Sequence, residues 1–156
     1  MLDAILSPQR VFVDLAPAPK AELLRGVCRR LAALGEVEDA EALAELLIRR
    51  EALITTAVKT GFAFPHAFTP QVESLKLTIG VIREGTDYES LDGAPVEFVL
   101  LLIGPPARQD VHLRVLARLS NIAREPGALE ALRALATPQA IVDFFAQSDR
   151  MFATIG

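Results

Sequence analysis

The sequence predicts an α/β sandwich in which a mixed β-sheet is flanked by helices on both faces. A continuous apolar run from Val96 to Ile103 is typical of a central strand buried on both sides. The segment from Leu75 to Ile82 alternates apolar residues with polar or small ones, as expected for a strand with two different faces. Long segments with helical periodicity lie between such strand-like segments, which is the order that an α/β fold requires.

The first half of the chain predicts a strand, two helices and a second strand, in that order. Residues 11–15 alternate as a half-buried strand does, and an Ala-Pro-Ala-Pro sequence follows them. Leucine-rich segments at helical spacing predict helices over about 20–34 and 39–50. A stretch of β-branched residues then leads into a short strand over 62–64, and the proline that follows predicts the end of that strand.

The second half of the chain, after the central strand, is mostly helical. Helical periodicity extends over 112–123, and a Glu-Pro-Gly sequence ends it. A short helix is predicted over about 128–135, and a Thr-Pro pair predicts the start of a last helix through about Ala146. The tail from Gln147 is expected to be weakly structured.

Size and charge limit the possible functions of the chain. Its 156 residues are enough for one domain, which we expect to span 1–156 with a core of about 5–147. The net charge of −4 argues against a nucleic-acid partner, because such proteins neutralise phosphates with lysine and arginine. No apolar run approaches the roughly 20 residues that span a bilayer, which argues against membrane insertion, and no secretory signal opens the chain. A cytoplasmic location is therefore expected.

Few cofactor or metal sites fit this sequence. Cys28 is the only cysteine and lies on an apolar helical stripe, so we expect a buried side chain and no cysteine-rich metal site. Glycine-rich nucleotide loops, a GxSxG nucleophile elbow and an HExxH zinc motif are absent. Asp110 and His112 are two residues apart, so on a helix they point in different directions and make a poor ligand pair. We expect neither a cofactor nor a metal.

The two histidines are the candidates for chemistry. His66 follows the short apolar strand and Pro65, so it is expected at the rim of the sheet, where a neutral imidazole could attack phosphorus. A second imidazole and an arginine would suffice to hold a phosphoryl group that a partner brings. Plainer interpretations stay open: His66 as a rim side chain bonded to a loop carbonyl, His112 as a core residue, and Arg50 as a solvated helix end.

Two blocks of sequence resemble a known family. Arg50-Glu51 is followed, at the family's spacing, by Thr56, Gly61, Ala63, Pro65 and His66, and a second block runs from Leu91 through the central strand to His112, Leu113 and Leu116. Over about 5–145, the chain resembles the enzyme IIA domains of the bacterial phosphoenolpyruvate-dependent phosphotransferase system. The resemblance is to the class shared by the fructose, mannitol and nitrogen-regulatory types.

This resemblance implies a mixed sheet flanked by helices, and it implies roles for particular residues. His66 would accept a phosphoryl group from the phosphocarrier protein HPr or a nitrogen-branch HPr-like protein, and no cofactor would be needed. His112 would hydrogen-bond the imidazole or the phosphoryl group, and Arg50 would help to hold the phosphate. Thr56 and Lys59 are possible supporting residues. The docking surface for the partner would include three aromatic residues, Phe62, Phe64 and Phe68.

Departures from the family pattern leave two hypotheses. Ala57, Lys59 and Ala67 stand where the family usually has glycine, which restricts the loop to negative φ more strongly. The leading hypothesis is a phosphocarrier that passes its phosphoryl group to a IIB component or uses it as a regulatory signal, with the nitrogen-regulatory type favoured over a sugar-specific one. The alternative is a IIA-like interaction module that binds a regulated kinase or transporter without being phosphorylated.

Overall fold

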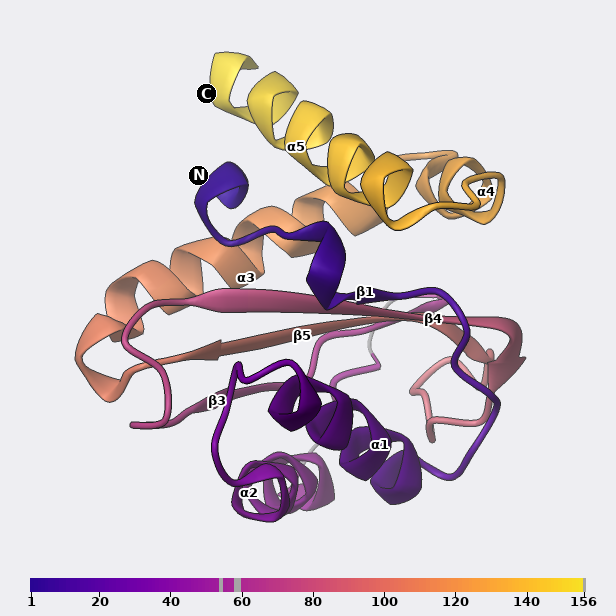
Figure 1. The fold of residues 1–156 in the computed structure, drawn as a ribbon. Coiled ribbons are helices and arrows are strands. Elements are labelled where there is room, and N and C mark those ends of the chain that lie inside the picture. Colours follow the sequence, from indigo (N-terminus) through magenta and orange to yellow (C-terminus); the bar gives the residue numbers. More distant parts are fainter. Residues whose placement is uncertain (54, 58–59, 156) are drawn as a thin grey trace.

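A five-stranded mixed β-sheet forms the centre of the molecule (Figure 1). The structure, a computed structural model, describes residues 1–53, 55–57 and 60–155. The two long strands β4 (Lys76–Thr86) and β5 (Val96–Gly104) pair antiparallel. The short strand β1 (Val11–Phe12) adds parallel to β4, while β2 (Phe62–Ala63) and β3 (His66–Phe68) both pair parallel to β5. The predicted mixed sheet is confirmed.

Helices cover both faces of this sheet, as predicted (Figure 1). One face carries α1 (Lys20–Ala33) and α2 (Ala40–Leu53). The other carries α3 (Gln109–Arg124), α4 (Ala128–Arg133) and α5 (Pro138–Ile155). Among the described parts of the chain, no helix has the length and apolar character to cross a membrane.

The central strand β5 explains why there are two cores. Successive side chains of a strand point to opposite faces, so an apolar strand with helices on each side contributes to both. Val99, Leu101 and Ile103 pack with α1 and α2, whereas Leu100 and Leu102 pack with α3 and α5. The continuous apolar run therefore formed the buried central strand that the sequence predicts.

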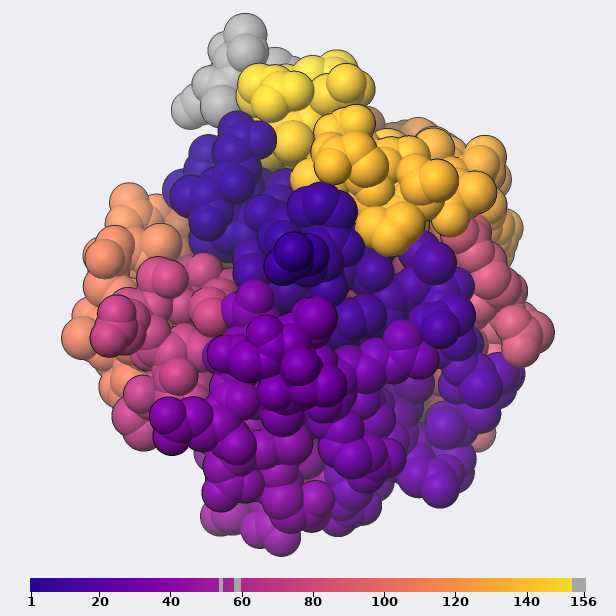
Figure 2. All heavy atoms as spheres, viewed as in Figure 1, coloured from indigo at the N-terminus to yellow at the C-terminus, as the bar shows by residue number. Residues whose placement is uncertain are grey.

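The C-terminal helix is longer than predicted. α5 continues through the segment from Gln147, which was expected to be weakly structured, and ends at Ile155. Asp149, 2% exposed, accepts hydrogen bonds from the Leu2 backbone N–H at 2.9 Å and from Arg118 at 2.8 Å. Figure 2 shows the N-terminal segment lying against this helix. The buried carboxylate joins the two ends of the described chain and stabilises the last turns of α5.

The structure has a further short strand after the one predicted over 62–64. β2 ends at Ala63, and a second short strand, β3, starts at His66 and pairs with the same neighbour, β5. Pro65 lacks a backbone N–H, but its carbonyl still accepts a hydrogen bond from the Leu102 N–H at 2.9 Å. Pro65 therefore interrupts the pairing with β5 without ending it. His66 is the first residue of the further strand, β3.

Candidate functional site

His66 is held at the start of β3 with a defined tautomer. Its side chain is half-buried, and its Nδ1 atom lies 2.7 Å from the backbone oxygen of Phe64. A carbonyl oxygen can only accept a hydrogen bond, so Nδ1 must carry the proton. In the neutral ring the lone pair then resides on Nε2, which leaves that atom as the nucleophile.

His112 lies next to His66 because β5 leads directly into α3. β5 ends at Gly104, a short turn follows, and His112 falls in the first turn of α3, beside the part of β5 that pairs with β3. The centroids of the two imidazole rings are 5.8 Å apart, and the Phe68 ring lies 4.5 Å from the His112 ring. Residues 46 positions apart in sequence thus meet at one end of the central strand.

The His112 ring is buried without hydrogen-bond partners. It is 1% exposed, and neither Nδ1 nor Nε2 has a partner among the residues that the structure describes. Gly104 makes room for it: a Cβ added at that glycine would lie 3.4 Å from the His112 Nδ1 atom. An unpaired buried polar group costs about 1–3 kcal/mol, so its retention calls for an explanation beyond packing.

Burial keeps His112 neutral. Burial first, and then the electrostatic effects of His66 and Arg50, lower the pKa of His112 from 6.5 to about 4. A neutral imidazole offers one N–H donor and one acceptor nitrogen. At neutral pH, His112 can therefore donate a hydrogen bond to an anionic group bound at His66.

Arg50 supplies a cation that no described acid neutralises. It lies in the last turn of α2 with an exposed side chain, and it forms no ion pair with any residue in the described ranges. Its charge acts on His112. The structure thus places two of the predicted site residues, His66 and His112, side by side, with the third, Arg50, near enough for its charge to lower the pKa of His112.

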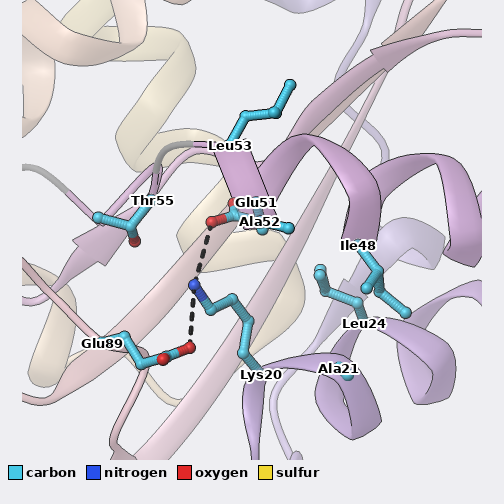
Figure 3. Close-up of a pocket in the computed structure, with 9 residues that line it drawn as sticks. All are labelled: Lys20, Ala21, Leu24, Ile48, Glu51, Ala52, Leu53, Thr55 and Glu89. Atoms are coloured by element: carbon cyan, nitrogen blue, oxygen red, sulfur yellow. Dashed lines mark ion pairs between the residues drawn. The ribbon is translucent and has the colours of Figure 1, made fainter.

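The sequence placed Glu51 only in a motif and predicted no role for its carboxylate, which lies buried beside this site. Glu51 is 5% exposed and accepts hydrogen bonds from the backbone N–H of Thr56 at 3.0 Å, from the Thr56 hydroxyl and from the Tyr88 hydroxyl at 3.1 Å. Lys20 forms ion pairs with Glu51 at 3.6 Å and with Glu89 at 3.2 Å, and lies between them in Figure 3. A signal was present: Glu51 continues the apolar i, i+4 stripe of Leu43 and Leu47, where a carboxylate needs buried partners.

Two of the three predicted docking aromatics do not lie on the surface. Phe62 is 1% exposed and Phe64 7% exposed, and the Phe62 ring packs against the Phe98 ring at a centroid distance of 5.8 Å. The prediction that these two form a docking surface is wrong, because both side chains pack into the core that α3 and α5 cover. Phe68 is half-buried against His112 and remains a candidate. An exposed apolar residue next to the site is Leu113, 65% exposed on α3.

The loop substitutions cause no backbone strain where the structure describes them. Ala57 and Ala67 are buried and keep negative φ, so neither needs the glycine that is usual there. Lys59, the third departure and a predicted supporting residue, lies outside the described residues. Thr56 does lie at the site, with its side chain directed to Glu51.

Fold and site together define an α/β sandwich with a two-histidine site at the end of its central strand. Over residues 4–148 the sequence matches the family described as the phosphoenolpyruvate-dependent sugar phosphotransferase system, EIIA 2, and the chain belongs to this family.

Several relatives show how far this similarity extends. The chain is 34% identical over 143 residues to the nitrogen regulatory protein of Bradyrhizobium diazoefficiens, which covers 91% of this chain and 92% of that protein. It is 27% identical over 146 residues to the fructose-specific EIIABC component of Bacillus subtilis, a match that covers 94% of this chain and only 23% of that protein. Its fold is similar to the crystal structure of the nitrogen regulatory protein IIA-Ntr from Neisseria meningitidis, with a TM-score of 0.85, 22% identity and coverage of 92% and 98% of the two chains.

Proposed function

We propose that this chain is a phosphocarrier whose His66 accepts a phosphoryl group from HPr or an HPr-like protein. The observation that carries the proposal is the pair of histidine rings with unequal bonding. His66 has its Nδ1 bonded to the Phe64 oxygen, while the neighbouring His112 has two buried nitrogens without a described partner. A group bound to the first ring would supply the partner that the second ring lacks.

The transfer step follows from the tautomer of His66. The lone pair of Nε2 attacks the phosphorus atom of the donor's phosphohistidine, a new N–P bond forms, and the N–P bond in the donor breaks with its electron pair returning to the donor imidazole. Nδ1 keeps its proton throughout, because the Phe64 oxygen accepts it. The product has a labile N–P bond, so His66 can pass the group on to a IIB component.

His112 and Arg50 would stabilise the charge that moves. Phosphoryl transfer depends mainly on in-line positioning and on stabilising negative charge spread over three oxygens. Neutral His112 offers one N–H donor to such an oxygen, and Arg50 offers a planar guanidinium without a described competitor. The Phe68 ring packs against His112, so water is partly excluded there and electrostatic interactions of His112 are stronger.

We favour the nitrogen-regulatory type over a sugar-specific one. The chain is 34% identical to the Bradyrhizobium nitrogen regulatory protein and 27% identical to the fructose-specific relative from Bacillus. In this type the phosphorylation state of His66 would be a signal to a regulated kinase or transporter. The protein would work in the cytoplasm, where phosphoenolpyruvate supplies the phosphoryl group.

The test is incubation with phosphoenolpyruvate, enzyme I and HPr or its nitrogen-branch relative. Wild type should gain one acid-labile phosphate, and His66→Ala should gain none. Absence of label in wild type with both donors, or equal label in His66→Ala, would refute the proposal. The alternative is a module that is never phosphorylated, and its basis was the replacement of the usual glycines. Ala57 and Ala67 have no backbone strain, so these two replacements do not favour it. That alternative predicts unlabelled wild type and unchanged partner binding by His66→Ala.

A further inference from the structure

Phe64 is the residue that orients His66. It lies between β2 and β3, where pairing with β5 is interrupted. The carbonyl of Phe64 accepts the Nδ1 proton of His66 at 2.7 Å, and its N–H donates to the backbone oxygen of Thr56 at 3.2 Å. Phe64 therefore connects the Nδ1 atom of His66 to a segment outside the sheet.

That segment is held by one carboxylate. The backbone N–H of Thr56 donates to one oxygen of Glu51 and the Thr56 hydroxyl donates to the other. Two donors from one residue that bind both oxygens of one carboxylate fix position and orientation together. The carbonyl of Thr56 lies on the other side of the same Cα atom, so the contact with Glu51 holds the residue whose carbonyl accepts the Phe64 N–H.

The carboxylate itself has little freedom. Tyr88, fully buried, donates its hydroxyl to Glu51 at 3.1 Å, and Lys20 forms an ion pair with Glu51 on the side where Figure 3 shows Glu89. A cavity of about 490 Å³ lies beside this pair and is lined on its apolar side by Leu24 and Ile48. Three hydrogen bonds from Thr56 and Tyr88 therefore hold Glu51 where it is nearly inaccessible to solvent.

We propose that Glu51 is a positioning residue for His66. Through Thr56 and the peptide of Phe64, it selects the Nδ1–H tautomer and so leaves Nε2 free to react. The consequence of this positioning for phosphoryl transfer rests on the function proposed above. The effect of Glu51 on the tautomer of His66 concerns the unphosphorylated protein and can be measured on that protein alone.

The direct test is ¹⁵N NMR of the histidine rings in wild type and Glu51→Gln, which report the ratio of the two neutral tautomers of His66. The two Thr56 donors bind different oxygens of the carboxylate, so in Glu51→Gln one of them would face an NH2 group in place of an acceptor oxygen. Loss of one such hydrogen bond should lower the Nδ1–H to Nε2–H ratio about fivefold. Glu45→Gln is the matched control, because Glu45 lies on the same helix, is exposed and pairs only with Arg49 at 3.7 Å among described residues. It should keep the wild-type ratio.

Two substitutions at Thr56 keep the proposal testable if Glu51→Gln does not fold. Thr56→Ser retains both donors to Glu51 and should keep the wild-type tautomer ratio. Thr56→Val loses the hydroxyl donor and should lower the ratio about fivefold. A wild-type ratio in Thr56→Val, or in a folded Glu51→Gln, would overturn the proposal.

Transfer kinetics separate the two proposals. In Glu51→Gln the labelling rate at saturating HPr-type donor should fall by the same factor as the measured fraction of His66 in the Nδ1–H tautomer, with the donor's KM unchanged, since the docking surface is untouched. A shifted tautomer ratio with no labelling of any variant, wild type included, would support positioning and reject the carrier function. If wild type is labelled, and the Glu51 variant shows an unshifted tautomer ratio and an unchanged labelling rate, the carrier function is supported and positioning by Glu51 is rejected.

Discussion

The two histidines lie side by side but are held in opposite ways. His66 is half-exposed, and its Nδ1 has a hydrogen-bond partner that orients the ring. His112 is 1% exposed, and both of its nitrogens lack a described partner. The difference teaches that orientation and accessibility are supplied to one ring, while unused hydrogen-bonding capacity is kept in the other. A phosphoryl acceptor has to be oriented and accessible, and a group that stabilises the phosphoryl group has to have a free hydrogen-bond donor.

The largest effect on the labelling rate should come from His112→Leu. The same substitution separates catalysis from stability. Loss of one preorganised donor to the transferred group should lower the labelling rate of His66 about 100-fold. Removal of two unpaired buried nitrogens should leave the free energy of unfolding at pH 7 unchanged or raise it by about 1 kcal/mol. Radiolabelling and urea denaturation measure the two quantities. A variant that is much less stable yet fully active would mean that His112 is a core residue only.

Acid should destabilise the protein through His112. Its pKa is 6.5 in the unfolded chain and about 4 in the fold, so between these values the unfolded state binds the extra proton. Stability from this group is present above pH 6.5 and is lost as pH falls toward 4. Between pH 7 and pH 5 wild type should lose about 2 kcal/mol more than His112→Leu. Parallel pH profiles for the two proteins would show that the ring is not kept neutral by burial.

Arg50→Gln should act on both histidines from the surface. Removal of this cation should lower the labelling rate about tenfold, because one charge no longer stabilises the phosphoryl oxygens. The pKa of His112 should rise, since the Arg50 charge lowers it. Arg49→Gln, one residue earlier and paired with Glu45, is the control. Equal effects of the two substitutions would indicate a general charge effect rather than a role for Arg50.

Gly104→Ala should give the smallest effect and should perturb only the buried ring. The added Cβ would lie 3.0 Å from Leu75 Cγ and 3.4 Å from His112 Nδ1, so the neighbouring side chains must shift by a few tenths of an ångström. We expect a loss of about 1 kcal/mol in unfolding free energy. In NMR spectra, the His112 ring signals should move while the His66 tautomer ratio stays constant. A change in the His66 tautomer ratio together with the His112 signals would show that the two rings are coupled through their packing.

Periodicity predicted the parts of the fold that depend on apolar patterns. The run from Val96 to Ile103 formed the central strand because both faces of the sheet are covered. The strand β3 was missed because Pro65 signals an end, although its carbonyl still pairs with Leu102. The last turns of α5 were missed because their stabilising contact comes from Asp149, a charged residue whose partners are distant in sequence.

The sequence predicted which residues belong to the candidate site but not how they are arranged. The family resemblance pointed to His66, His112 and Arg50, but their meeting depends on the turn between β5 and α3, which no periodic pattern encodes. Phe62 and Phe64 were misplaced because an apolar residue beside a candidate site is equally compatible with packing and docking. Glu51 was read only as part of a motif, although its position on the Leu43–Leu47 stripe indicated burial.

One measurement tests the central claim most directly. After incubation of ¹⁵N-labelled protein with phosphoenolpyruvate, enzyme I and the HPr-type donor, the ³¹P–¹⁵N coupling identifies the phosphorylated nitrogen. We predict a single acid-labile phosphate on Nε2 of His66, with Nδ1 still protonated. A phosphate on Nδ1, on His112 or on no histidine at all would contradict the account.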